Sequence, residues 1–498
     1  MARRIRWLGV GMTLCFVLLF LQLNNIQVVK AHQYANDPNN PTKIAARFDQ
    51  PRGIIESADG QTLAMSVASS AGSLYKYKRV YPEQWAQLFS GVVGTDSIDF
   101  SNYGVEATYN NFLVAHSRPV KTLKDLLTTS PPVTDTITLT VSTKMQEAAK
   151  TALAGKVGAV VALDPQTGSV LAMYANPTFD PNPLASLDGT TEANAFKIDT
   201  TKIFGFAPLT SLAYQNAGYA PGSTFKTITT AAAYDHAPQL VNTPIPAFAT
   251  IPVNYFKGQA TTLSNDTPGE SCGGTIAVML PISCDTGYAI LGTKIGPAGM
   301  LAEAQSFGFN QQPPIDLPHS RYEVSNFLLP PSQCSAQVFL AFSSIGQKCT
   351  AASPLQMAMV ASAIADNGAM MTPHVMSQIR DSDGNLVEKY QPKVWKQATS
   401  PATAAAVTNL MRQVVSSPQG TAAGVGFLPQ DDVAAKTGTA QAGSGNTSVN
   451  AWMIAFAPAS HPVIAVAVMV PGARLDQFGA TVAGPIVKAM IETALNGR

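Results

Sequence analysis

The chain of 498 residues carries 32 basic and 31 acidic side chains, so its formal net charge is only +1, and hydrophobic residues make up 46% of it. This length is more than one ordinary domain needs, and it predicts two or three domains with a large core. A nearly neutral chain has no long-range field that would gather nucleic acid, so we expect no nucleic-acid partner.

The N-terminus predicts a membrane anchor. Three arginines within the first six residues precede an uncharged, mostly apolar run from Trp7 to Leu23. About twenty apolar residues span a bilayer, and arginines stay on the cytoplasmic side, so the rest of the chain is expected outside the membrane. We assign residues 1–29 to a cytoplasmic tip and a single transmembrane anchor; a cleaved signal peptide is the alternative.

Residues 30–140 are mixed and turn-rich, with strand-like patches at Gly53–Ile55 and Ser73–Tyr77. A stretch rich in Thr, Ser and Pro, Thr128–Thr140, then leads into a helical pattern at Ser142–Leu153, and we place a domain boundary there. The sequence therefore predicts an N-terminal domain with strands over 30–140 and a second domain over 141–498.

After the helical pattern comes a hairpin signal, in which the turn Asp164–Gly168 joins Val157–Leu163 to Ser169–Tyr174. Helical patterns dominate the middle third, and strand patterns return near the end. Strands at both ends with helices between them predict an α+β fold with one antiparallel sheet completed by the C-terminal strands. The further expected elements are the helices Ser223–Tyr234, Thr275–Gly292 and Ala483–Leu495, and the strands Val433–Ala440, Ala451–Phe456 and Val463–Val470.

Cysteines fit an extracytoplasmic domain. Apart from Cys15 in the apolar run there are four, which allow three pairings. Short loops close most readily, which favours Cys272–Cys284 and Cys334–Cys349; free buried thiols are the alternative. No cysteine–histidine spacing resembles a zinc site, and we predict no metal or cofactor.

The first segment whose side chains could carry out catalysis is Pro221-Gly222-Ser223-Thr224-Phe225-Lys226. If a helix begins here, Ser223 and Lys226 lie one turn apart on the same face, and a desolvated lysine can act as the base that a serine nucleophile needs. Ser73 and Lys76 match the same spacing, and we interpret that pair as part of a half-exposed strand. The breaker pair Pro221-Gly222 favours Ser223 because it places the serine at a helix entrance.

Lys436-Thr437-Gly438-Thr439 is the second such segment and lies inside an apolar strand. A cation, two hydroxyls and a glycine that permits close approach suit a substrate carboxylate lying along a strand edge. An exposed edge strand with a protective lysine is the alternative.

A third segment, Ser283-Cys284-Asp285, lies between these two within a helical pattern. Ser264-Asn265-Asp266 also lies between them, in a polar, turn-like stretch, and is the weaker candidate for this third motif. The order Ser-x-x-Lys, Ser-x-Asn and Lys-Thr-Gly belongs to the penicillin-recognising serine enzymes, and this chain carries Asp285 where that pattern has Asn.

Together these motifs resemble a class B penicillin-binding protein, a monofunctional peptidoglycan D,D-transpeptidase, particularly the penicillin-binding protein A type of actinobacteria. The resemblance covers nearly the whole chain, including the N-terminal anchor, the hairpin and a pair of cysteines like Cys272 and Cys284. It implies a transpeptidase domain with an antiparallel five-stranded sheet flanked by helices and an all-helical subdomain, preceded by an anchor and a dimerisation-like pedestal. Its other segments are Arg52-Gly53-Ile54-Ile55, Asp59-Gly60, Leu63-Ala64, Tyr219–Lys226, Ser344-Ile345-Gly346-Gln347, Lys436–Ala440 and Ala451-Trp452.

The resemblance also implies roles. Ser223 would attack the penultimate D-Ala carbonyl of a stem peptide, with Lys226 as its base, and an amine of a second stem peptide would resolve the acyl-enzyme. Ser283 and Lys436 would pass a proton to the leaving amine, while Thr437, Gly438 and Thr439 would form the carboxylate-binding strand. The amides of Ser223 and Thr439 would form the oxyanion hole. β-Lactams would acylate Ser223, and the pedestal would contact a membrane-embedded glycan polymerase of the shape, elongation, division and sporulation (SEDS) family.

Asp285 is the departure with chemical consequences. A carboxylate can only accept hydrogen bonds, whereas an amide can also donate. At about 4 Å from Lys226, with an effective dielectric constant near 20, it would attract the ammonium by roughly 4 kcal/mol and favour the wrong form for a base. We expect slower acylation or a shifted pH optimum, unless Asp285 is protonated or lies farther away.

Three alternative functions follow. A β-lactamase would need a deacylating glutamate motif, which the sequence lacks between Ser283 and Lys436. A D,D-carboxypeptidase differs only in using water as the acceptor. A catalytically weakened scaffold or β-lactam sensor would keep the fold while Asp285 reduces activity.

Overall fold

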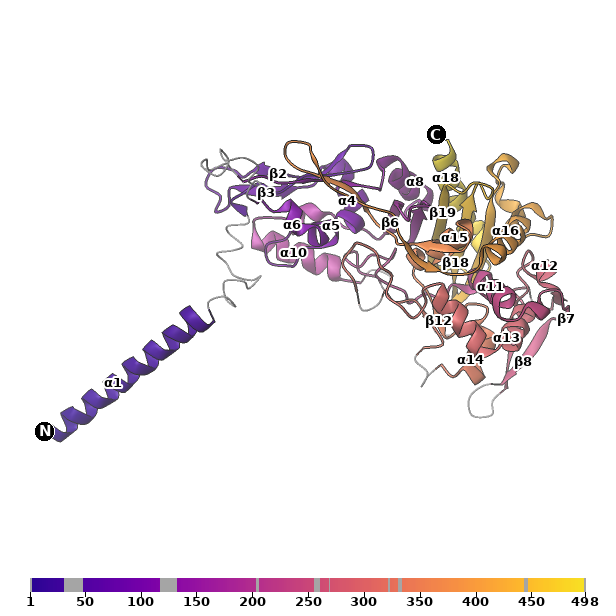
Figure 1. The fold of residues 1–498 in the computed structure, drawn as a ribbon, viewed down its shortest axis with the longest axis horizontal. Coiled ribbons are helices and arrows are strands. Elements are labelled where there is room, and N and C mark those ends of the chain that lie inside the picture. Colours follow the sequence, from indigo (N-terminus) through magenta and orange to yellow (C-terminus); the bar gives the residue numbers. More distant parts are fainter. Residues whose placement is uncertain are drawn as a thin grey trace.

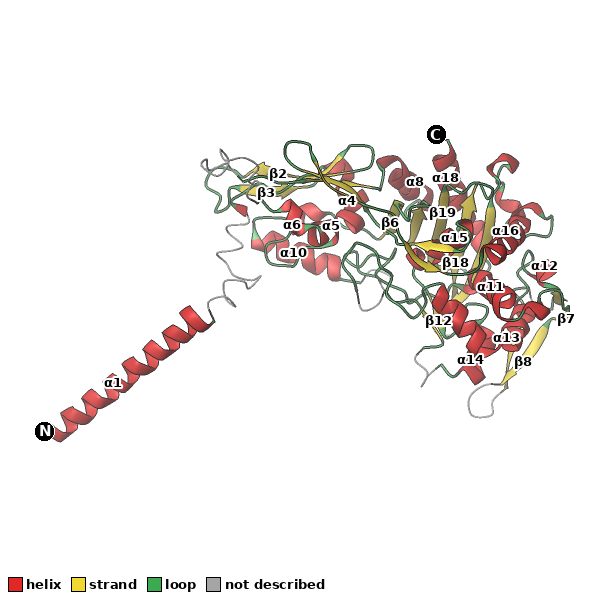
Figure 2. Ribbon diagram, viewed as in Figure 1, coloured by secondary structure: helices red, strands yellow, loops and turns green. Residues whose placement is uncertain are grey.

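The computed structural model describes residues 2–30, 48–116, 132–202, 206–254, 260–267, 269–320, 323–329, 334–442 and 447–496. Part of the segment Thr128–Thr140, on which the predicted boundary depends, lies outside the described residues. Within them the chain forms an N-terminal helix, a mixed β-rich region and a larger α+β region (Figures 1 and 2).

The N-terminal helix α1, Ala2–Asn24, lies apart from the folded body (Figure 1). The stretch Arg6–Val28 is, within the described residues, the one helical segment long and apolar enough to cross a membrane, and none of its most apolar window is buried. Exposed Leu, Phe and Val side chains of this kind are unfavourable in water and favourable in a bilayer.

The larger region is built on the predicted five-stranded antiparallel sheet, which is confirmed. Three C-terminal strands lie beside the hairpin, so segments about 300 residues apart in the sequence become neighbours. The helices α8 (Thr143–Leu153) and α18 (Gly484–Leu495) pack on each other and on this sheet, and α15 (Pro354–Ala365) packs on its central strands. The strands, in sheet order, are β17 Ala434–Ala442, β18 Ser448–Ala457, β19 Ile464–Ala473, β5 Gly158–Leu163 and β6 Val170–Asn176.

A second lobe lies beside β17 and carries the helices α11 (Lys226–His236), α13 (Asp285–Ser306) and α14 (Ala336–Ser343). The subdomain that the resemblance implies to be all-helical also contains three two-stranded sheets. Their strands are β7 Ile245–Phe248 with β10 Cys272–Gly274, β8 Thr250–Asn254 with β9 Ala260–Ser264, and β11 Asn326–Phe327 with β12 Thr350–Ala351.

The expected helix Thr275–Gly292 is wrong as one element. It is divided into a short α12, Ile276–Met279, and the long α13. Pro281 cannot donate to a continuing helix, and Ser283 has a positive φ of 59°. Because of this break the Ser283 side chain does not follow the helix and points toward Lys226 and Lys436.

The pedestal sheet has six strands, and two of them come from far along the chain. The strand β14 pairs with β4 of the N-terminal region on one side and with β15 on the other, so the pedestal sheet is not built from residues 30–140 alone. The sheet order is β15 Leu386–Lys389, β14 Met376–Arg380, β4 Thr136–Leu139, β1 Ile55–Glu56, β2 Thr62–Ala68 and β3 Tyr77–Val80.

Arg52, from the segment Arg52-Gly53-Ile54-Ile55, belongs to a buried cluster of charged side chains. Glu106 accepts from Arg52 Nε and from Arg79 Nε, both at 2.6 Å, and all three side chains are almost fully buried. The Glu106 carboxylate is the common acceptor of the two guanidinium groups, and this pairing offsets part of the cost of burying the three charges. Ser73 and Lys76, by contrast, lie in the loop between β2 and β3, so the half-exposed strand expected for this pair is wrong.

Candidate active site

Ser223 lies on a tight turn held against the edge strand β17. It is the second residue of the 3₁₀ turn Gly222–Phe225, and α11 begins directly afterwards at Lys226. A side-chain carbon at Gly438 of β17 would come within 2.8 Å of the carbonyl oxygen of Pro221, so this close approach requires glycine. Ser223 is 3% exposed, and in the described part of the chain its hydroxyl makes no hydrogen bond. The hydroxyl lines a cavity, where a substrate can reach it.

The segment Ser344–Gln347 supports this turn from behind. Gly222 N–H donates to the carbonyl oxygen of Gly346 at 2.9 Å. Gly346 has a φ of 74°, and a side-chain carbon there would lie 2.1 Å from Gly222 O. Only glycine satisfies both conditions, which accounts for this motif beside the serine.

Lys226 is fully buried and directs its ammonium group at the segment Ser283–Asp285. Its Nζ donates to Ser283 O at 2.6 Å, to Asp285 Oδ1 at 2.7 Å and to Ser283 Oγ at 3.3 Å. Asp285 is itself only 6% exposed. The alternative in which Asp285 lies away from Lys226 is therefore wrong.

Lys436 approaches the same serine from the sheet. Its Nζ lies 2.8 Å from Ser283 Oγ and 3.0 Å from Thr437 O, and its side chain is 0% exposed. Burial, and next the positive charge of Lys226, lower the pKa of Lys436 well below its usual range, against the opposing effect of Asp285 and Asp266. Two lysines on one hydroxyl, with one carboxylate in contact, form a site in which one amine is readily neutral.

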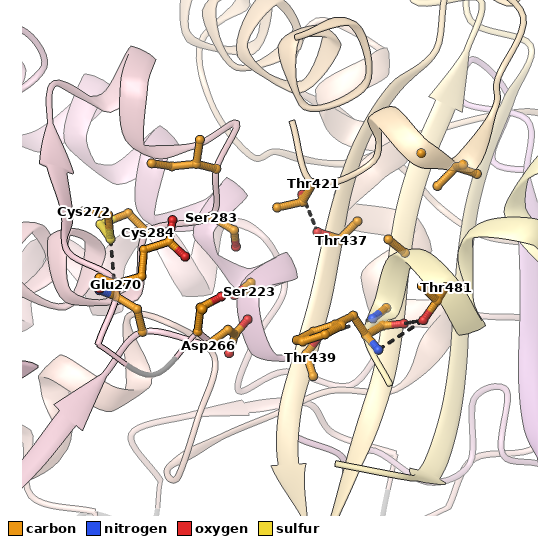
Figure 3. A pocket seen from close by; sticks show the side chains of 18 of the residues that line it. Ser223, Asp266, Glu270, Cys272, Ser283, Cys284, Thr421, Thr437, Thr439 and Thr481 are labelled. Carbon is orange, nitrogen blue, oxygen red and sulfur yellow. Dashed lines mark hydrogen bonds between the residues drawn. A yellow bond between two sulfur atoms is a disulfide. The ribbon is translucent and has the colours of Figure 1, made fainter. Parts of the chain in front are cut away.

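A cavity of about 630 Å³ lies between the second lobe and the sheet. Figure 3 shows Ser223, Ser283 and Asp266 on one wall and Thr421, Thr437 and Thr439 on the other. The nucleophile candidate therefore faces hydroxyl groups that suit a carboxylate.

The lower-ranked triplet Ser264-Asn265-Asp266 also contributes to the site. Asn265 and Asp266 both line the cavity. Desolvation and then the negative charge of Asp285 raise the pKa of Asp266 to about 6, although both lysines oppose this shift. Asn265 Oδ1 accepts from Thr286 N–H at 3.0 Å and so caps the start of α13.

A disulfide fixes the same region. Cys284, between Ser283 and Asp285, is bonded to Cys272 of β10, the pairing that the short loop favours. Cys334 and Cys349 form a second disulfide. The first one covalently ties the loop that carries Asp266 to the segment Ser283–Asp285.

Sequence reasoning missed Thr421. This residue follows α16 (Pro401–Ser416), and its Oγ1 lies 2.6 Å from Thr437 Oγ1. Its N–H donates to Pro281 O at 3.1 Å, so Thr421 links the sheet edge to the Ser283 loop. Nothing in its local sequence signals this, because both partners are brought to it by the tertiary fold.

A cavity-facing serine on a turn, with two buried lysines around a second serine, defines a serine acyl-transfer site. Residues 158–492 match the penicillin binding protein transpeptidase domain, and residues 52–137 match the penicillin binding protein A dimerisation domain. The chain belongs to the penicillin-binding protein transpeptidase family.

The chain is also similar, over almost its full length, to individual members of this family. The chain is 34% identical to the peptidoglycan D,D-transpeptidase PbpA of Mycolicibacterium smegmatis over 508 residues, covering 99% of this chain and 98% of the relative. It is 33% identical to PbpA of Mycobacterium tuberculosis, covering 99% of both chains. The structure of penicillin-binding protein A from M. tuberculosis as a ceftriaxone acyl-enzyme complex aligns with a TM-score of 0.79 at 32% identity, over 91% of this chain and 100% of that one.

Proposed function

We propose that this chain is a peptidoglycan D,D-transpeptidase that cross-links stem peptides through an acyl-enzyme on Ser223. The observation that carries the proposal is the cavity that Ser223 lines together with Ser283, Thr437 and Thr439. The names of the PbpA relatives and the ceftriaxone acyl-enzyme of the M. tuberculosis protein support it.

In this reaction Ser223 Oγ attacks the carbonyl of the penultimate D-Ala and expels the terminal D-Ala. Thr437 and Thr439 bind the terminal carboxylate, and Ser283 with Lys436 returns a proton to the leaving amine. The N–H groups of Ser223 and Thr439 stabilise the oxyanion, a contribution for which the loss of one donor typically costs about 3 kcal/mol. An amine of a second stem peptide then takes the acyl group and frees Ser223.

Labelling with a fluorescent penicillin tests the nucleophile. Wild-type protein should carry one covalent label that is lost in Ser223→Ala. The matched control is Ser73→Ala, because Ser73 has the same spacing to a lysine but lies in the loop before β3. Absence of label on the folded wild-type protein would instead favour the scaffold function, for which the contact between Lys226 and Asp285 is the supporting observation.

Product analysis separates transpeptidase from carboxypeptidase. A D-Ala-D-Ala peptide should yield a cross-linked dimer when an amine acceptor is present, at the expense of the hydrolysed product. Hydrolysis alone, unchanged by the acceptor, would indicate a carboxypeptidase, and rapid turnover of penicillin would indicate a β-lactamase.

The membrane placement is part of the proposal. The apolar stretch Arg6–Val28 supports a single-pass anchor, and the arginines that precede it support a cytoplasmic N-terminus with the catalytic region outside. Protease added to intact cells should digest the catalytic region and spare the N-terminal tip; the opposite result would reverse the topology.

We assign the pedestal role to residues 30–140 and the catalytic role to residues 141–498. The hairpin β14–β15, from the second of these regions, completes the pedestal sheet. By resemblance to class B proteins, the pedestal would contact a SEDS-type glycan polymerase in the membrane. Crosslinking from pedestal positions to such a polymerase in cells, with positions near α16 as controls, tests this partner.

A further inference from the structure

We infer that Lys348 and Asp266 select the donor stem peptide by the side chain of the residue that precedes its two D-Ala. That side chain carries both a carboxylate, which Lys348 attracts, and an ammonium group, which Asp266 attracts. The inference rests on the proposed acyl-enzyme chemistry of Ser223. It adds a substrate preference set by two residues outside the Ser-x-x-Lys, Ser-x-Asn and Lys-Thr-Gly motifs.

A second cavity continues the catalytic one along the edge strand β17. It has a volume of about 280 Å³ and shares Asp266, Thr439 and Phe478 with the catalytic cavity. Residues two apart on a strand point to the same face. The catalytic cavity is lined by Thr437 and Thr439, and the second cavity by Thr439 and Gln441. The two cavities therefore follow one another along one face of β17.

The position of Ser223 sets the direction of the donor peptide along this face. A side-chain carbon at Gly222, next to Ser223, would lie 2.6 Å from Thr439 O, so the turn that carries the nucleophile lies beside Thr439. With the terminal carboxylate of the donor at the Thr437 end and the scissile carbonyl at Ser223, the acyl part of the peptide runs on toward Gln441. The residue that precedes the two D-Ala therefore has its side chain at the second cavity.

The charged side chains of this second cavity are not all occupied within the protein. Of the described residues that line it, three are charged, namely Asp266, Asp285 and Lys348. Asp285 is paired with Lys226 at 2.7 Å. Within the described part of the chain, neither Asp266 nor Lys348 forms an ion pair, and both side chains are exposed, so a ligand can reach them. Figure 3 shows Asp266 at the end of the catalytic cavity where Thr439 lies.

The backbone and an aromatic ring hold Lys348 at the cavity. Its φ is 56°, a left-handed conformation that is unfavourable for a residue other than glycine. The next residue, Cys349, is fixed by its disulfide to Cys334 and by the N–H of Leu328, which donates to Cys349 O at 2.8 Å. Lys348 Nζ lies 5.8 Å from the centroid of the Phe342 ring, which also lines the cavity. The ammonium group is thereby kept at the cavity wall.

A cation and an anion on one small cavity match a side chain that carries both charges. The amides of Gln347 and Gln441 also line the cavity and can hydrogen-bond to either charge. A side chain with an ammonium group alone would be repelled by Lys348, and one with a carboxylate alone would be repelled by Asp266. The class of donor that fits is therefore a peptide with a diamino dicarboxylic acid before its two D-Ala.

Four synthetic donor peptides that end in D-Ala-D-Ala test this selection on the full-length, detergent-solubilised protein. The residue before the two D-Ala is diaminopimelic acid, with both side-chain charges, aminopimelic acid, with the carboxylate only, lysine, with the ammonium only, or norleucine, with neither. Release of D-Ala gives kcat/KM for each donor at pH 8, where Asp266, with its pKa of about 6, is ionised. The variants are Lys348→Gln and Asp266→Asn, and each removes one charge.

Each kcat/KM is divided by that of the norleucine donor, which cancels any general change in the activity of a variant. Lys348→Gln should lower the ratio for the aminopimelate donor by about three- to fivefold and raise the ratio for the lysine donor. Asp266→Asn should do the opposite, lowering the lysine ratio and raising the aminopimelate ratio. The matched control is Lys294→Gln, which removes an exposed lysine of α13 that does not line the cavity and should change neither ratio.

Ratios that stay constant in Lys348→Gln and Asp266→Asn, or that both move in the same direction in one variant, overturn the inference. A change in Lys294→Gln as large as in Lys348→Gln also overturns it, because the effect would then come from the overall charge of the lobe. Failure of the proposed function is distinct: the wild-type protein would release D-Ala from none of the four donors and would carry no penicillin label, and the inference would fall with it.

Discussion

Lys226 and Asp285 form a buried ion pair at 2.7 Å, and each is the first residue of the helix that carries it, α11 and α13 respectively. The ammonium lies at a helix start, where the helix dipole disfavours a cation, so the carboxylate is the group that makes this arrangement stable. Lys226 and Asp285 lie within three residues of Ser223 and Ser283 respectively, so the pair joins the stability of the lobe to the proposed chemistry of the site.

Asp285→Asn should move the acid limb of penicillin acylation to lower pH. The Asp285 carboxylate raises the pKa of Lys436, so its removal makes this amine easier to deprotonate. An opposite charge in contact typically moves a pKa by about 1–3 units, which corresponds to about tenfold or more in rate below the limb. The measurement is the second-order rate constant from pH 5 to 9. Asp285→Glu keeps the charge and is the control, and superimposable wild-type and Asn profiles would contradict the prediction.

Loss of the Cys272–Cys284 disulfide should reduce both stability and acylation. Its 12-residue separation predicts a stabilisation of about 3 kcal/mol, and its position inside the Ser283–Asp285 segment predicts an acylation rate at least tenfold lower. The double variant Cys334→Ala with Cys349→Ala is the matched control, because it removes a disulfide of similar separation, 15 residues, that does not line the cavity. Denaturant unfolding and penicillin labelling distinguish the two. Equal loss of acylation in both pairs would mean that the first disulfide acts only through global stability.

The sequence was sufficient for features that depend on local spacing. The hairpin, the final strands, Ser223 with Lys226 and the strand around Lys436 each have a pattern within about ten residues, and all lie where the sequence places them. The five-stranded sheet follows because these strands have nowhere else to bury their apolar faces.

The positions of Thr421, Asp266 and the strands β14 and β15 depend on long-range packing. Thr421 reaches Thr437 only after α16 has packed against β17, and Asp266 reaches the cavity because a disulfide holds its loop there. The strands β14 and β15 join a sheet whose other strands precede them by more than 230 residues. Local propensity cannot identify partners at such distances.

Glu303→Gln should make the stability of the protein less dependent on pH. Glu303 Oε2 lies 3.0 Å from His236 Nε2, at the end of α11 and α13 opposite to Lys226 and Asp285. Burial, and then the charge of Asp235, raise the pKa of Glu303 from 4.5 to about 9. Between these two pH values the native state binds a proton that the unfolded state has released, so the free energy of unfolding falls as pH rises, by up to about 1.4 kcal/mol per pH unit.

Glutamine is neutral at every pH and can still donate to His236, so the variant should lose this component and show a flatter profile. Urea unfolding at pH 5, 7 and 9 measures it. Glu147→Gln is the control, because Glu147 is an exposed acid on α8 and its replacement should leave the slope unchanged. A variant as pH-dependent as the wild type would show that Glu303 is ionised in the native protein.

Thr421→Val should weaken recognition of the substrate carboxylate. The Thr421 hydroxyl lies 2.6 Å from the Thr437 hydroxyl inside the cavity, so it orients the group that is proposed to bind that carboxylate. Removing one such hydrogen bond costs about 1–1.5 kcal/mol, or roughly tenfold in kcat/KM. Thr421→Ser keeps the hydroxyl and should retain activity.

The measurement is acylation by a peptide ester substrate with a free terminal carboxylate and by its counterpart in which that carboxylate is amidated. The valine variant should lose about tenfold for the first substrate only, because the second has no carboxylate to recognise. An equal loss for both would mean that Thr421 acts by holding the Ser283 loop through its bond to Pro281.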